Sequence, residues 1–434
     1  MLKVSKFGGS SLSSSEQFLK VKDIVLSDPL RKAIVVSAPG KRFKEDNKIT
    51  DLLYLLCAHI KYKVDYSLVF DIIKERYTSI RNELKIDYDL EKEFKDLEEI
   101  FTKNPSEEFI VSRGENLCAK LFASFVGYKF VDAIEIMKFN YDGSLNSELT
   151  SSLIKKSLEE NERIVIPGFY GSYPNGGVKL FSRGGSDVTG AIVASSLEAS
   201  IYENWTDVSG IKVCDPKIIP NPKKISEITY DELRELSYMG ASVLHEETIF
   251  PVQELNIPIN ILNTNAPNEE GTIITKSCKD SSTLITGIAG KKDFTSFNIV
   301  KSRNSNKIDL IRLVLDIFNK YNVNIEHIPT GIDSFSVVVD SSEIEKCYFD
   351  LIGELKSIDD INKLDVEGEI ALVAVVGRNM ALKPGTSGKI FAILGNNDIN
   401  IKMIAQGANE INIIVGVSNY DFEKTIKVIY DNMI

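Results

Sequence analysis

The sequence predicts an α/β protein in which helices cover both faces of a mainly parallel sheet, followed by two smaller α+β modules. Three observations support this prediction. Over roughly the first 275 residues, short β-branched runs alternate with longer segments of helical period, which is typical of a parallel sheet between helices. A turn-rich stretch near Asn265–Ser282 then indicates a boundary. Beyond this boundary, two similar segments recur along the chain.

Six short runs rich in β-branched residues are the predicted strands of the first region. They are Leu2–Lys6, Ala33–Ser37, Lys129–Ala133, Arg163–Pro167, Ile201–Trp205 and Ile257–Asn263. Segments of helical period lie between several of them, such as Glu16–Leu26 and Val188–Leu197. The charge-rich residues 41–110 are also helical in period. We expect them to form either a helical insertion or lid beside the sheet, or one more peripheral helical layer.

The region after the boundary contains an internal repeat. Tyr321–Val338 (YNVNIEHIPTGIDSFSVV) aligns without gaps to Asn397–Ile414 (NDINIKMIAQGANEINII). A helical segment precedes each copy and another follows it, so we expect a duplicated strand–helix–hairpin–helix unit. A solenoid needs more repeats, and chance similarity between two hairpins is the remaining alternative. The predicted domains are therefore residues 1–275, 284–360 and 361–434.

Composition indicates a soluble globular protein without a metal site. Of the 434 residues, 43% are hydrophobic and 26% are charged, and the net charge of −11 disfavours nucleic acid as a partner. The apolar stretch Ile370–Val376 is far too short to span a membrane, and Met1–Lys6 lacks the apolar core of a signal peptide. The five cysteines form no Cys-x-x-Cys pair and the three histidines have no zinc spacing. We therefore expect reduced thiols in a cytoplasmic protein and no histidine-driven hydrolysis.

The first candidate motif, Lys6-Phe7-Gly8-Gly9-Ser10-Ser11, directly follows the first predicted strand. Two adjacent glycines let backbone N–H groups approach an anion, and a lysine supplies a mobile charge suited to phosphate. The serines could cap the following helix, whose N-terminus also favours anions. From the residues alone, a plain strand–turn–helix connection with a solvated lysine is the simpler explanation.

A second glycine-rich turn, Ser182–Gly190 (SRGGSDVTG), opens an apolar helix after the strand-like Val178–Phe181. Arg183 offers a fork of donors for a carboxylate or a phosphate. Asp187 either caps the helix or orients Lys6 across the edge of the sheet. Because ligands of parallel sheets lie at the carboxyl ends of the strands, two such turns in one sheet favour a binding site more than either turn alone.

Two further motifs contain polar groups beside predicted elements. Trp205–Lys217 (WTDVSGIKVCDPK) follows a strand, and its polar side chains and lysines could bind a nucleotide; an ordinary surface hairpin is the alternative. Ser112-Arg113-Gly114-Glu115 precedes the apolar segment Leu117–Phe125, where Glu115 either benefits from the helix dipole or binds an ammonium group. The sequence contains neither a Walker A motif nor a G-x-G-x-x-G fingerprint, which disfavours P-loop and dinucleotide enzymes.

Taken together, these motifs resemble those of the aspartate kinases, within the amino-acid kinase family. The segments KFGGSS and SRGGSD are similar to the family's KFGG[ST]S and GRGGSD motifs. WTDVSG with CDPK is similar to its TDVxG…DPR motif, SRGE to its helix-start glutamate motif, and MGASVLH (Met239–His245) to its GAKVLH motif. These segments follow the family's order along nearly the whole chain. The duplicated units resemble its paired ferredoxin-like ACT domains. The resemblance implies the amino-acid kinase fold and transfer of phosphate from ATP, with Mg²⁺, to the β-carboxylate of L-aspartate. The product would be 4-phospho-L-aspartate, the first intermediate of lysine, threonine and methionine biosynthesis.

The resemblance also implies roles for individual residues. Lys6, with Phe7, Gly8 and Gly9, would hold the β- and γ-phosphates, and Asp187 would be the second catalytic residue. Arg183 would bind the α-carboxylate of the substrate and Glu115 its α-ammonium group. The other implied substrate positions are Ser37, Thr50 and Ser186, and the other implied ATP positions are Thr206, Asp207, Lys212, Lys217, Ser242 and Val243. Lys212 and Ser242 depart from the tyrosine and the lysine that are common in the family.

The paired ACT-like modules imply feedback control and assembly. Such modules bind a small amino acid at an interface between modules, and Glu326, next to Ile325, matches an acidic position that contacts lysine in lysine-sensitive relatives. We therefore expect lysine as the effector and a homo-oligomer, either a dimer or a tetramer; a solvated residue at a hairpin edge is the alternative for Glu326. Two other functions stay open: a kinase of the same fold acting on glutamate or acetylglutamate, and a non-catalytic amino-acid sensor.

Overall fold

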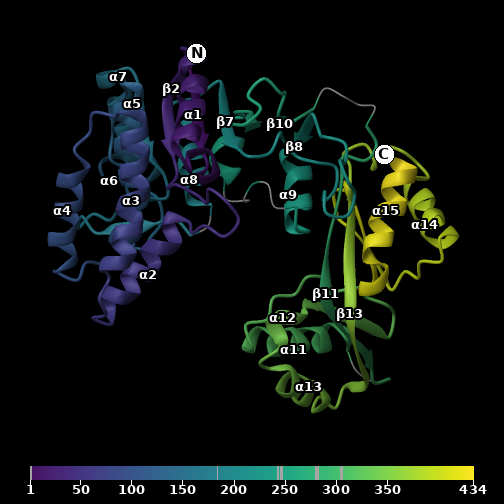
Figure 1. Cartoon of the computed structure of the whole chain (residues 1–434). Helices are drawn as coiled ribbons and strands as arrows, with labels where there is room; N and C mark the ends of the chain where they lie inside the picture. Colours follow the sequence, from purple (N-terminus) through teal and green to yellow (C-terminus); the bar gives the residue numbers. More distant parts are fainter. Residues whose placement is uncertain (1, 183, 242–243, 245–247, 279–282, 304–305) are drawn as a thin grey trace. The chain divides into compact units, whose positions relative to one another are not determined.

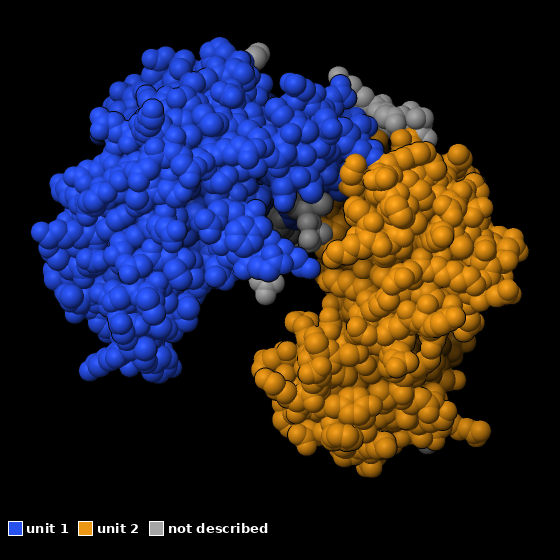
Figure 2. Space-filling model, viewed as in Figure 1, with its two compact units in different colours: residues 1–211, 224–230, 243–278 blue, residues 212–223, 231–242, 279–434 orange. Residues whose placement is uncertain are grey.

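The computed structural model describes residues 2–182, 184–241, 244, 248–278, 283–303 and 306–434 (Figure 1). The chain divides into two compact units (Figure 2). Unit 1 consists of residues 1–211, 224–230 and 243–278, and unit 2 consists of residues 212–223, 231–242 and 279–434. In the part of the chain that the structure describes, no helix has both the length and the apolar character needed to cross a membrane.

An eight-stranded sheet forms the centre of unit 1, with the strand order β3-β4-β2-β1-β7-β9-β10-β8. The strands are β1 (Lys3–Phe7), β2 (Arg31–Val36), β3 (Lys129–Phe130), β4 (Ile164–Pro167), β7 (Ile201–Thr206), β8 (Glu227–Thr229), β9 (Ile259–Asn263) and β10 (Thr272–Thr275). Neighbouring strands pair in parallel, apart from the antiparallel pair of β9 with β10. The mainly parallel sheet is thereby confirmed, and a separate hairpin is formed by β5 (Tyr170–Ser172) and β6 (Val178–Leu180).

Helices flank this sheet, and those within residues 15–126 share a hydrophobic core with its central strand. They are α1 (Ser15–Ser27), α2 (Ile49–Lys61), α3 (Ser67–Leu84), α4 (Leu90–Phe101), α5 (Glu107–Val126), α6 (Ala133–Ile136), α7 (Ser147–Asn161), α8 (Gly185–Ser196) and α10 (Phe250–Gln253). Phe7 of β1, Phe18 of α1, Phe70 of α3 and Phe122 of α5 belong to one cluster of buried side chains. Because α2, α3 and α4 contribute to this same cluster, residues 41–110 form a helical layer that is continuous with the core.

Two helix starts differ from the sequence prediction because other residues cap them. The side chain of Ser106 accepts a hydrogen bond from the N–H of Phe109 and starts α5 at Glu107. Glu115 therefore lies in the middle of a helix, and its interpretation as a first-turn residue was wrong. Similarly, the side chain of Ser14 caps α1, whereas Ser10 and Ser11 lie in a short 3₁₀ helix (Gly9–Leu12).

One predicted strand is shorter than expected for a related reason. Lys129–Ala133 was predicted as a strand, but β3 ends at Phe130. The side chain of Asp132 accepts a hydrogen bond from the N–H of Ile134 and starts α6 at Ala133. A helix cap therefore overrides the β-branched pattern of this run.

Unit 2 contains a five-stranded antiparallel sheet with the order β12-β11-β13-β15-β14. Its strands are β11 (Gly287–Lys301), β12 (Ser334–Asp340), β13 (Ile361–Val376), β14 (Met403–Gln406) and β15 (Asn412–Ser418). Its helices are α11 (Lys307–Lys320), α12 (Ser341–Ile344), α13 (Tyr348–Lys356), α14 (Thr386–Asn396) and α15 (Phe422–Met433), together with most of α9 (Tyr230–Tyr238). The α+β character expected for the second region is confirmed.

The long strands β11 and β13 serve two hydrophobic cores. One core combines Phe297 of β11 and Leu364 of β13 with α11 and α13. The other combines Ile288 of β11 and Val373 of β13 with α14 and α15. Figure 1 shows these two groups of helices near opposite ends of the two strands. The expected ranges 284–360 and 361–434 follow chain order, whereas the two cores divide each long strand between them.

Both long strands change their geometry where one core gives way to the other. In β11, Asp293 has a left-handed φ of 69°, and in β13, Glu369 has a left-handed φ of 55°. The pairing register of the two strands shifts between Lys291 and Phe294. An irregularity of this kind bends a strand and increases its local twist, so the shared sheet is bent between the two cores.

A buried ionic network fixes the centre of the sheet in unit 1. Glu203 of β7 is only 3% exposed. Its carboxylate accepts hydrogen bonds from the Oγ of Ser5 (2.8 Å), the Nε of Arg31 (2.7 Å) and the Nε1 of Trp205 (3.0 Å). Burial alone would raise the pKa of Glu203, but the Arg31 guanidinium and the other donors hold it below its ordinary value. The network therefore links β1, β2 and β7 through a charged carboxylate.

We predict that Glu203→Gln lowers the thermal unfolding midpoint strongly, because it leaves the Arg31 guanidinium without its buried partner. Removing one member of such a pair costs about 3–5 kcal/mol of unfolding free energy. The depressed pKa means that this stabilisation is present above the ordinary value of 4.5 and is lost as the pH falls through the lower folded value. Thermal melts at neutral and acidic pH measure both effects.

Glu198→Gln is the matched control for this prediction. Glu198 pairs with Lys155 at 2.9 Å, but the two side chains are 71% and 46% exposed. Exposed pairs of this kind contribute about 0–1 kcal/mol, so the control variant should melt close to the unchanged protein. Equal midpoints for the two variants would contradict the role given to Glu203.

Candidate active site

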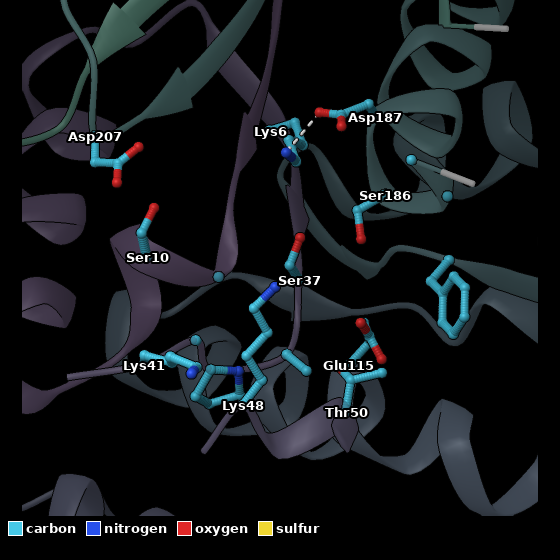
Figure 3. Close-up of a pocket in the computed structure, with 17 residues that line it drawn as sticks. Lys6, Ser10, Ser37, Lys41, Lys48, Thr50, Glu115, Ser186, Asp187 and Asp207 are labelled. Atoms are coloured by element: carbon cyan, nitrogen blue, oxygen red, sulfur yellow. Dashed lines mark ion pairs between the residues drawn. The ribbon is translucent and has the colours of Figure 1, made fainter. Parts of the chain in front are cut away.

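A cavity of about 610 Å³ lies within unit 1, at the carboxyl ends of its central strands (Figure 3). Its walls come from the end of β1 and its turn, the segments after β2 and β7, and parts of α2, α5 and α8. The lining residues are Lys6, Gly9, Ser10, Ser37, Ala38, Pro39, Gly40, Lys41, Lys48, Thr50, Glu115, Phe169, Gly184, Gly185, Ser186, Asp187 and Asp207. Residues that are far apart in sequence therefore meet at the edge of the sheet where ligands of parallel sheets bind.

Lys6 lies at the end of β1 and is held by two polar partners. Its residue is 7% exposed, and its Nζ lies 2.5 Å from the Oδ1 of Asp187. The Nδ2 of Asn204 donates to the same oxygen at 2.8 Å, and the Oδ1 of Asn204 lies 3.5 Å from the Nζ of Lys6. Figure 3 shows the side chains of Lys6 and Asp187 pointing toward each other at the wall of the cavity. Of the two interpretations of Asp187, the structure supports the one in which it orients Lys6.

Asn204 is a member of this cluster that the sequence analysis missed. It lies on β7 directly opposite Lys6 in the parallel pairing of β1 with β7. Successive side chains of a strand point to opposite faces, so Asn204 joins Lys6 on one face while Glu203 joins Ser5 on the other. Two adjacent polar residues, Glu203 and Asn204, within an otherwise aromatic and aliphatic run were the available signal.

A close backbone contact explains one glycine at this site, Gly9, and a left-handed backbone conformation explains another, Gly184. The N–H of Gly40 donates to the carbonyl oxygen of Gly9 at 2.8 Å. A Cβ atom added at Gly9 would lie 2.8 Å from the carbonyl oxygen of Ala38, which is closer than real contacts allow. Gly184, the N-cap residue of α8, has a left-handed φ of 58°. Glycine adopts this conformation without the steric strain that a side chain would cause. The two glycine-rich turns are thus shaped by packing as well as by the space that they leave for a ligand.

Glu115 places a buried carboxylate at the opposite wall of the cavity. It lies in the middle of α5 and is 5% exposed. Burial raises the pKa of Glu115 to about 7, against the opposing effect of the N–H of Ala38, which hydrogen-bonds to the carboxylate. Its Oε2 has no hydrogen-bond partner among the described residues. A buried acceptor without a partner is costly, and a cationic donor in the cavity would satisfy it.

The hydroxyl-bearing residues expected at the site also line the cavity. Ser37 follows β2, Thr50 is in the first turn of α2, and Ser186 is in the first turn of α8. Asp207 follows β7, and its Oδ1 accepts a hydrogen bond from the hydroxyl of Thr206 at 3.1 Å. The structure therefore brings together predicted phosphate, substrate and nucleotide positions from six separate segments.

Other predicted site residues lie elsewhere or cannot be placed. The side chain of Phe7 is fully buried and stacks on Trp205 with 5.9 Å between the ring centroids, so it belongs to the core. Gly8 does not line the cavity; its N–H donates to the carbonyl oxygen of Trp205 at 3.0 Å. Arg183, Ser242 and Val243 lie outside the described residues.

Lys212 and Lys217 belong to unit 2, within the segment of residues 212–223. The N–H of Val213 donates to the carbonyl oxygen of Lys223 at 2.9 Å, as in a hairpin. However, Cys214 and Ile219 pack into the core that contains α14 and α15. The segment is therefore anchored to the second core of unit 2 and is not a free surface hairpin.

The predicted effector residues also lie in unit 2. Ile325 packs against the core that contains α11 and α13. The backbone N–H of Glu326 donates to the carbonyl oxygen of Val338 at 2.9 Å. Burial, together with a hydrogen bond to Glu326, raises the pKa of the Tyr238 hydroxyl of α9. Glu326 is thus in contact with α9 and is not simply a solvated residue at a hairpin edge.

Comparison with known proteins decides the family. Residues 1–263 match the amino acid kinase family, and residues 373–433 match the ACT domain. The chain is 36% identical to aspartokinase 3 of Bacillus subtilis over 450 residues, which cover 99% of this chain and 98% of that protein. This chain belongs to the aspartokinases. The family and the fold that the motifs implied are therefore confirmed.

Other aspartokinases resemble this chain over its full length. The structure matches that of the aspartate kinase of Clostridium acetobutylicum with a TM-score of 0.96 and 46% identity, covering 100% of both chains. It matches aspartokinase III of Escherichia coli in complex with aspartate and ADP with a TM-score of 0.77 and 25% identity, again covering 100% of both chains. The lysine-sensitive aspartokinase 3 of Escherichia coli is 26% identical over 99% of this chain and 98% of that protein.

Proposed function

We propose that this aspartokinase transfers the γ-phosphoryl group of ATP to the β-carboxylate of L-aspartate, giving 4-phospho-L-aspartate and ADP. The observation that best supports this function is the pairing of two complementary groups in one cavity. Lys6 is a fixed cation suited to phosphate, and Glu115 is a buried carboxylate with an unsatisfied oxygen suited to an ammonium group. A free amino acid beside a polyphosphate satisfies both.

The phosphate end of the site is provided by Lys6 and the start of α8. Lys6 is oriented by Asp187 and Asn204, so its ammonium group does not have to reorganise when a substrate binds. The N-terminus of α8 opens at Gly185 on the cavity wall, and a helix N-terminus favours anions. Together these groups would hold the β- and γ-phosphates and neutralise the charge that develops during transfer.

The acceptor end of the site needs no general base. The β-carboxylate of aspartate is already ionised at neutral pH. One of its oxygens attacks the γ-phosphorus, the bond from that phosphorus to the bridging oxygen breaks, and the electron pair remains on ADP. What the enzyme must supply is alignment of the two reactants and cancellation of charge between two anions. A cavity whose described lining holds lysines, carboxylates and hydroxyls, but no histidine, is suited to this task.

Substrate recognition would use both head groups of aspartate. Glu115 would pair with the α-ammonium group, and the hydroxyls of Ser37, Thr50 and Ser186 would donate to the substrate carboxylates. Arg183, adjacent to Gly184 of the cavity wall, would bind the α-carboxylate as a bidentate partner. This arrangement favours an unmodified amino acid over an N-acetylated one, because acetylation removes the positive charge that Glu115 requires.

The nucleotide would be held near Asp207, with Thr206, Lys212, Lys217, Ser242 and Val243 as the further proposed ATP contacts. Mg²⁺ would enter bound to the phosphates, where its charge offsets theirs. Over the described residues, no group of three or more histidine, cysteine, aspartate or glutamate side chains could hold a metal ion. Mg²⁺ commonly relies on substrate phosphates and one or two carboxylates, and we propose Asp207 of the cavity lining for that role.

Unit 2 would regulate the enzyme through its ACT modules. We propose lysine as the effector, bound near Ile325 and Glu326, and a dimer or tetramer of this chain as the assembly. The Escherichia coli relative that is named lysine-sensitive, and a structure of aspartokinase III with lysine and aspartate at a TM-score of 0.78 and 25% identity, support this proposal. The catalytic region is proposed as residues 1–275. The five cysteines are all free thiols, which supports a reducing, cytoplasmic location.

The test of this function is a hydroxylamine trap, which converts an acyl phosphate to a hydroxamate. With ATP, the enzyme should form the hydroxamate of aspartate and not those of glutamate or N-acetylglutamate. Lys6→Ala should abolish turnover, because loss of a charge-stabilising group at a transferring centre costs about 10²–10³-fold in kcat. The melting temperature and aspartate binding, measured by calorimetry, should be largely retained.

Lys3→Ala is the matched control, since Lys3 lies on the same strand but pairs with Asp28 at 2.8 Å and Glu203 at 3.5 Å, away from the cavity lining. It should retain turnover. Near-normal turnover of Lys6→Ala would refute the role of Lys6. Hydroxamate formation from glutamate or acetylglutamate would indicate a kinase of the same fold that acts on that acid. If no acid yields a hydroxamate, the result would favour a non-catalytic amino-acid sensor.

We predict that aspartate binding depends on pH through Glu115. The raised pKa of about 7 means that the empty site prefers the protonated carboxyl at pH 6. Pairing with an ammonium group requires the carboxylate, so binding at pH 6 should release a proton, and affinity should rise with pH up to about 7 and then level off. Below that value the affinity should fall by up to about tenfold per pH unit. Calorimetry in two buffers of different ionisation enthalpy measures the released proton.

Glu115→Gln should weaken aspartate binding and remove this pH dependence without unfolding the protein. By the same raised pKa, Glu115 destabilises the empty fold as the pH rises from 4.5 to about 7, so the glutamine variant should melt at an equal or higher temperature at neutral pH. Glu108→Gln, at an exposed position of the same helix, is the control. Binding to the unchanged enzyme without proton release at pH 6 would argue against the ion pair.

Lysine should raise the melting temperature and lower the turnover of the full chain. A ligand that binds the folded state stabilises it in proportion to its concentration and affinity, and inhibition requires that lysine favour one of two states. Glu326→Gln should weaken both effects, whereas Glu345→Gln, an exposed acid of the same module, should not. If lysine changes neither the melting temperature nor the activity, the proposed effector is wrong.

A further inference from the structure

The cavity contains more positive charge than the assigned roles use. Its described lining includes three lysines, Lys6, Lys41 and Lys48, and three acids, Glu115, Asp187 and Asp207. Lys6 is already paired with Asp187, which offsets part of its charge. Glu115 is suited to an ammonium group. Transfer between a polyphosphate and a carboxylate brings two anions together, so a protein cation where they meet would stabilise the transition state in addition to Lys6 and the Mg²⁺ bound to the phosphates.

Lys48 is placed to supply this charge. It immediately precedes α2, next to the fully buried Ile49 and to Thr50, which also lines the cavity. Figure 3 shows its side chain extending from the start of α2 into the cavity toward Ser37. Across the described residues, its ammonium group has no hydrogen bond or ion pair. Lys41 differs, because its Nζ is turned toward the carbonyl oxygen of Lys44 at 3.5 Å.

The segment that presents Lys48 is anchored at several points. We call residues 41–48 the basic loop. The guanidinium of Arg76, which is 3% exposed, donates to the carbonyl oxygen of Gly40 at 2.8 Å and to the Oδ2 of Asp46 at 2.6 Å. Arg42 also donates to the Oδ2 of Asp46 at 2.9 Å, and these donors hold the pKa of that carboxyl well below its usual range.

The anchoring reaches the glycine turn of β1 as well. Gly40, immediately before the basic loop, donates its N–H to the carbonyl oxygen of Gly9. The other end of the loop is fixed by the burial of Ile49. Because both ends of the loop are fixed, the backbone that presents Lys48 is preorganised, and only the lysine side chain has to adjust to a bound phosphoryl group.

We propose that the ammonium group of Lys48 contacts the phosphoryl group during its transfer, as a second catalytic cation. This inference rests on the proposed aspartokinase reaction. The new bond joins a β-carboxylate oxygen to the γ-phosphorus, the bond to the bridging oxygen breaks, and its electron pair remains on ADP. Lys48 keeps its proton throughout and stabilises the negative charge on the oxygens of the transferring group, on the side of Ser37 and Thr50.

The experiment compares Lys48→Met, Lys48→Arg and Lys44→Met in the full-length enzyme, with the hydroxylamine trap as the assay. Lys48→Met should lower kcat about 10²-fold, while the KM for aspartate changes less than about threefold and the melting temperature is unchanged. Lys48→Arg should recover at least about tenfold of the lost kcat, because the charge is restored. Lys44 is an exposed lysine of the basic loop outside the cavity lining, so Lys44→Met should keep the kcat of the unchanged enzyme.

Three results would overturn the proposal: a kcat for Lys48→Met within about threefold of the unchanged enzyme, a loss confined to the KM for ATP, or an equal loss in Lys44→Met. Should Lys48→Met fail to fold, Lys48→Gln replaces it under the same criteria. Hydroxamate formation by the unchanged enzyme tests the proposed function separately. An active unchanged enzyme with an active Lys48→Met variant would therefore refute this inference alone.

Discussion

The ion pair between Lys6 and Asp187 is the interaction on which the rest of the site depends. It joins the end of the central strand to the first turn of α8, and Asn204 completes it from the neighbouring strand. The alternation of side chains along β1 and β7 places this cluster on one face of the sheet and the buried carboxylate of Glu203 on the other. The same pair of strands is therefore fixed from both faces, and Lys6, the proposed catalytic lysine, is held at the rigid centre of the sheet.

The distribution of charge in the cavity follows from the chemistry of joining two anions. An acceptor that is ionised before it reacts removes the need for proton transfer, and the difficulty becomes electrostatic. The cavity has lysines at the end of a strand and at the start of a helix, and burial raises the pKa of Glu115, the carboxyl proposed to pair with an ammonium group. The α-ammonium group of aspartate does not react, but its binding energy would help to position the β-carboxylate, which does react.

Local patterns in the sequence predicted most of the fold, and the resemblance to the aspartate kinases predicted cavity residues such as Ser37, Thr50 and Ser186. Parallel strands show as short β-branched runs, and glycine-rich turns show where strands end. The features that the sequence analysis did not predict depend on tertiary packing. Glu115 was expected at a helix start, whereas the cap at Ser106 extends α5 by two turns before it. Asn204 joins Lys6, which is distant from it in sequence, and the sharing of β11 and β13 between two cores arises only when the two strands pair and both groups of helices pack on them.

The two shared strands also set how the regulatory unit can respond to a ligand. Since β11 and β13 are continuous through both cores, the two ACT modules cannot slide apart without breaking backbone hydrogen bonds. The register shift near Asp293 and the left-handed residue Glu369 interrupt this regular pairing between the cores. Regular pairing is therefore weakest at this junction, and a change of twist between the two modules is accommodated there with the loss of fewer backbone hydrogen bonds than within either core.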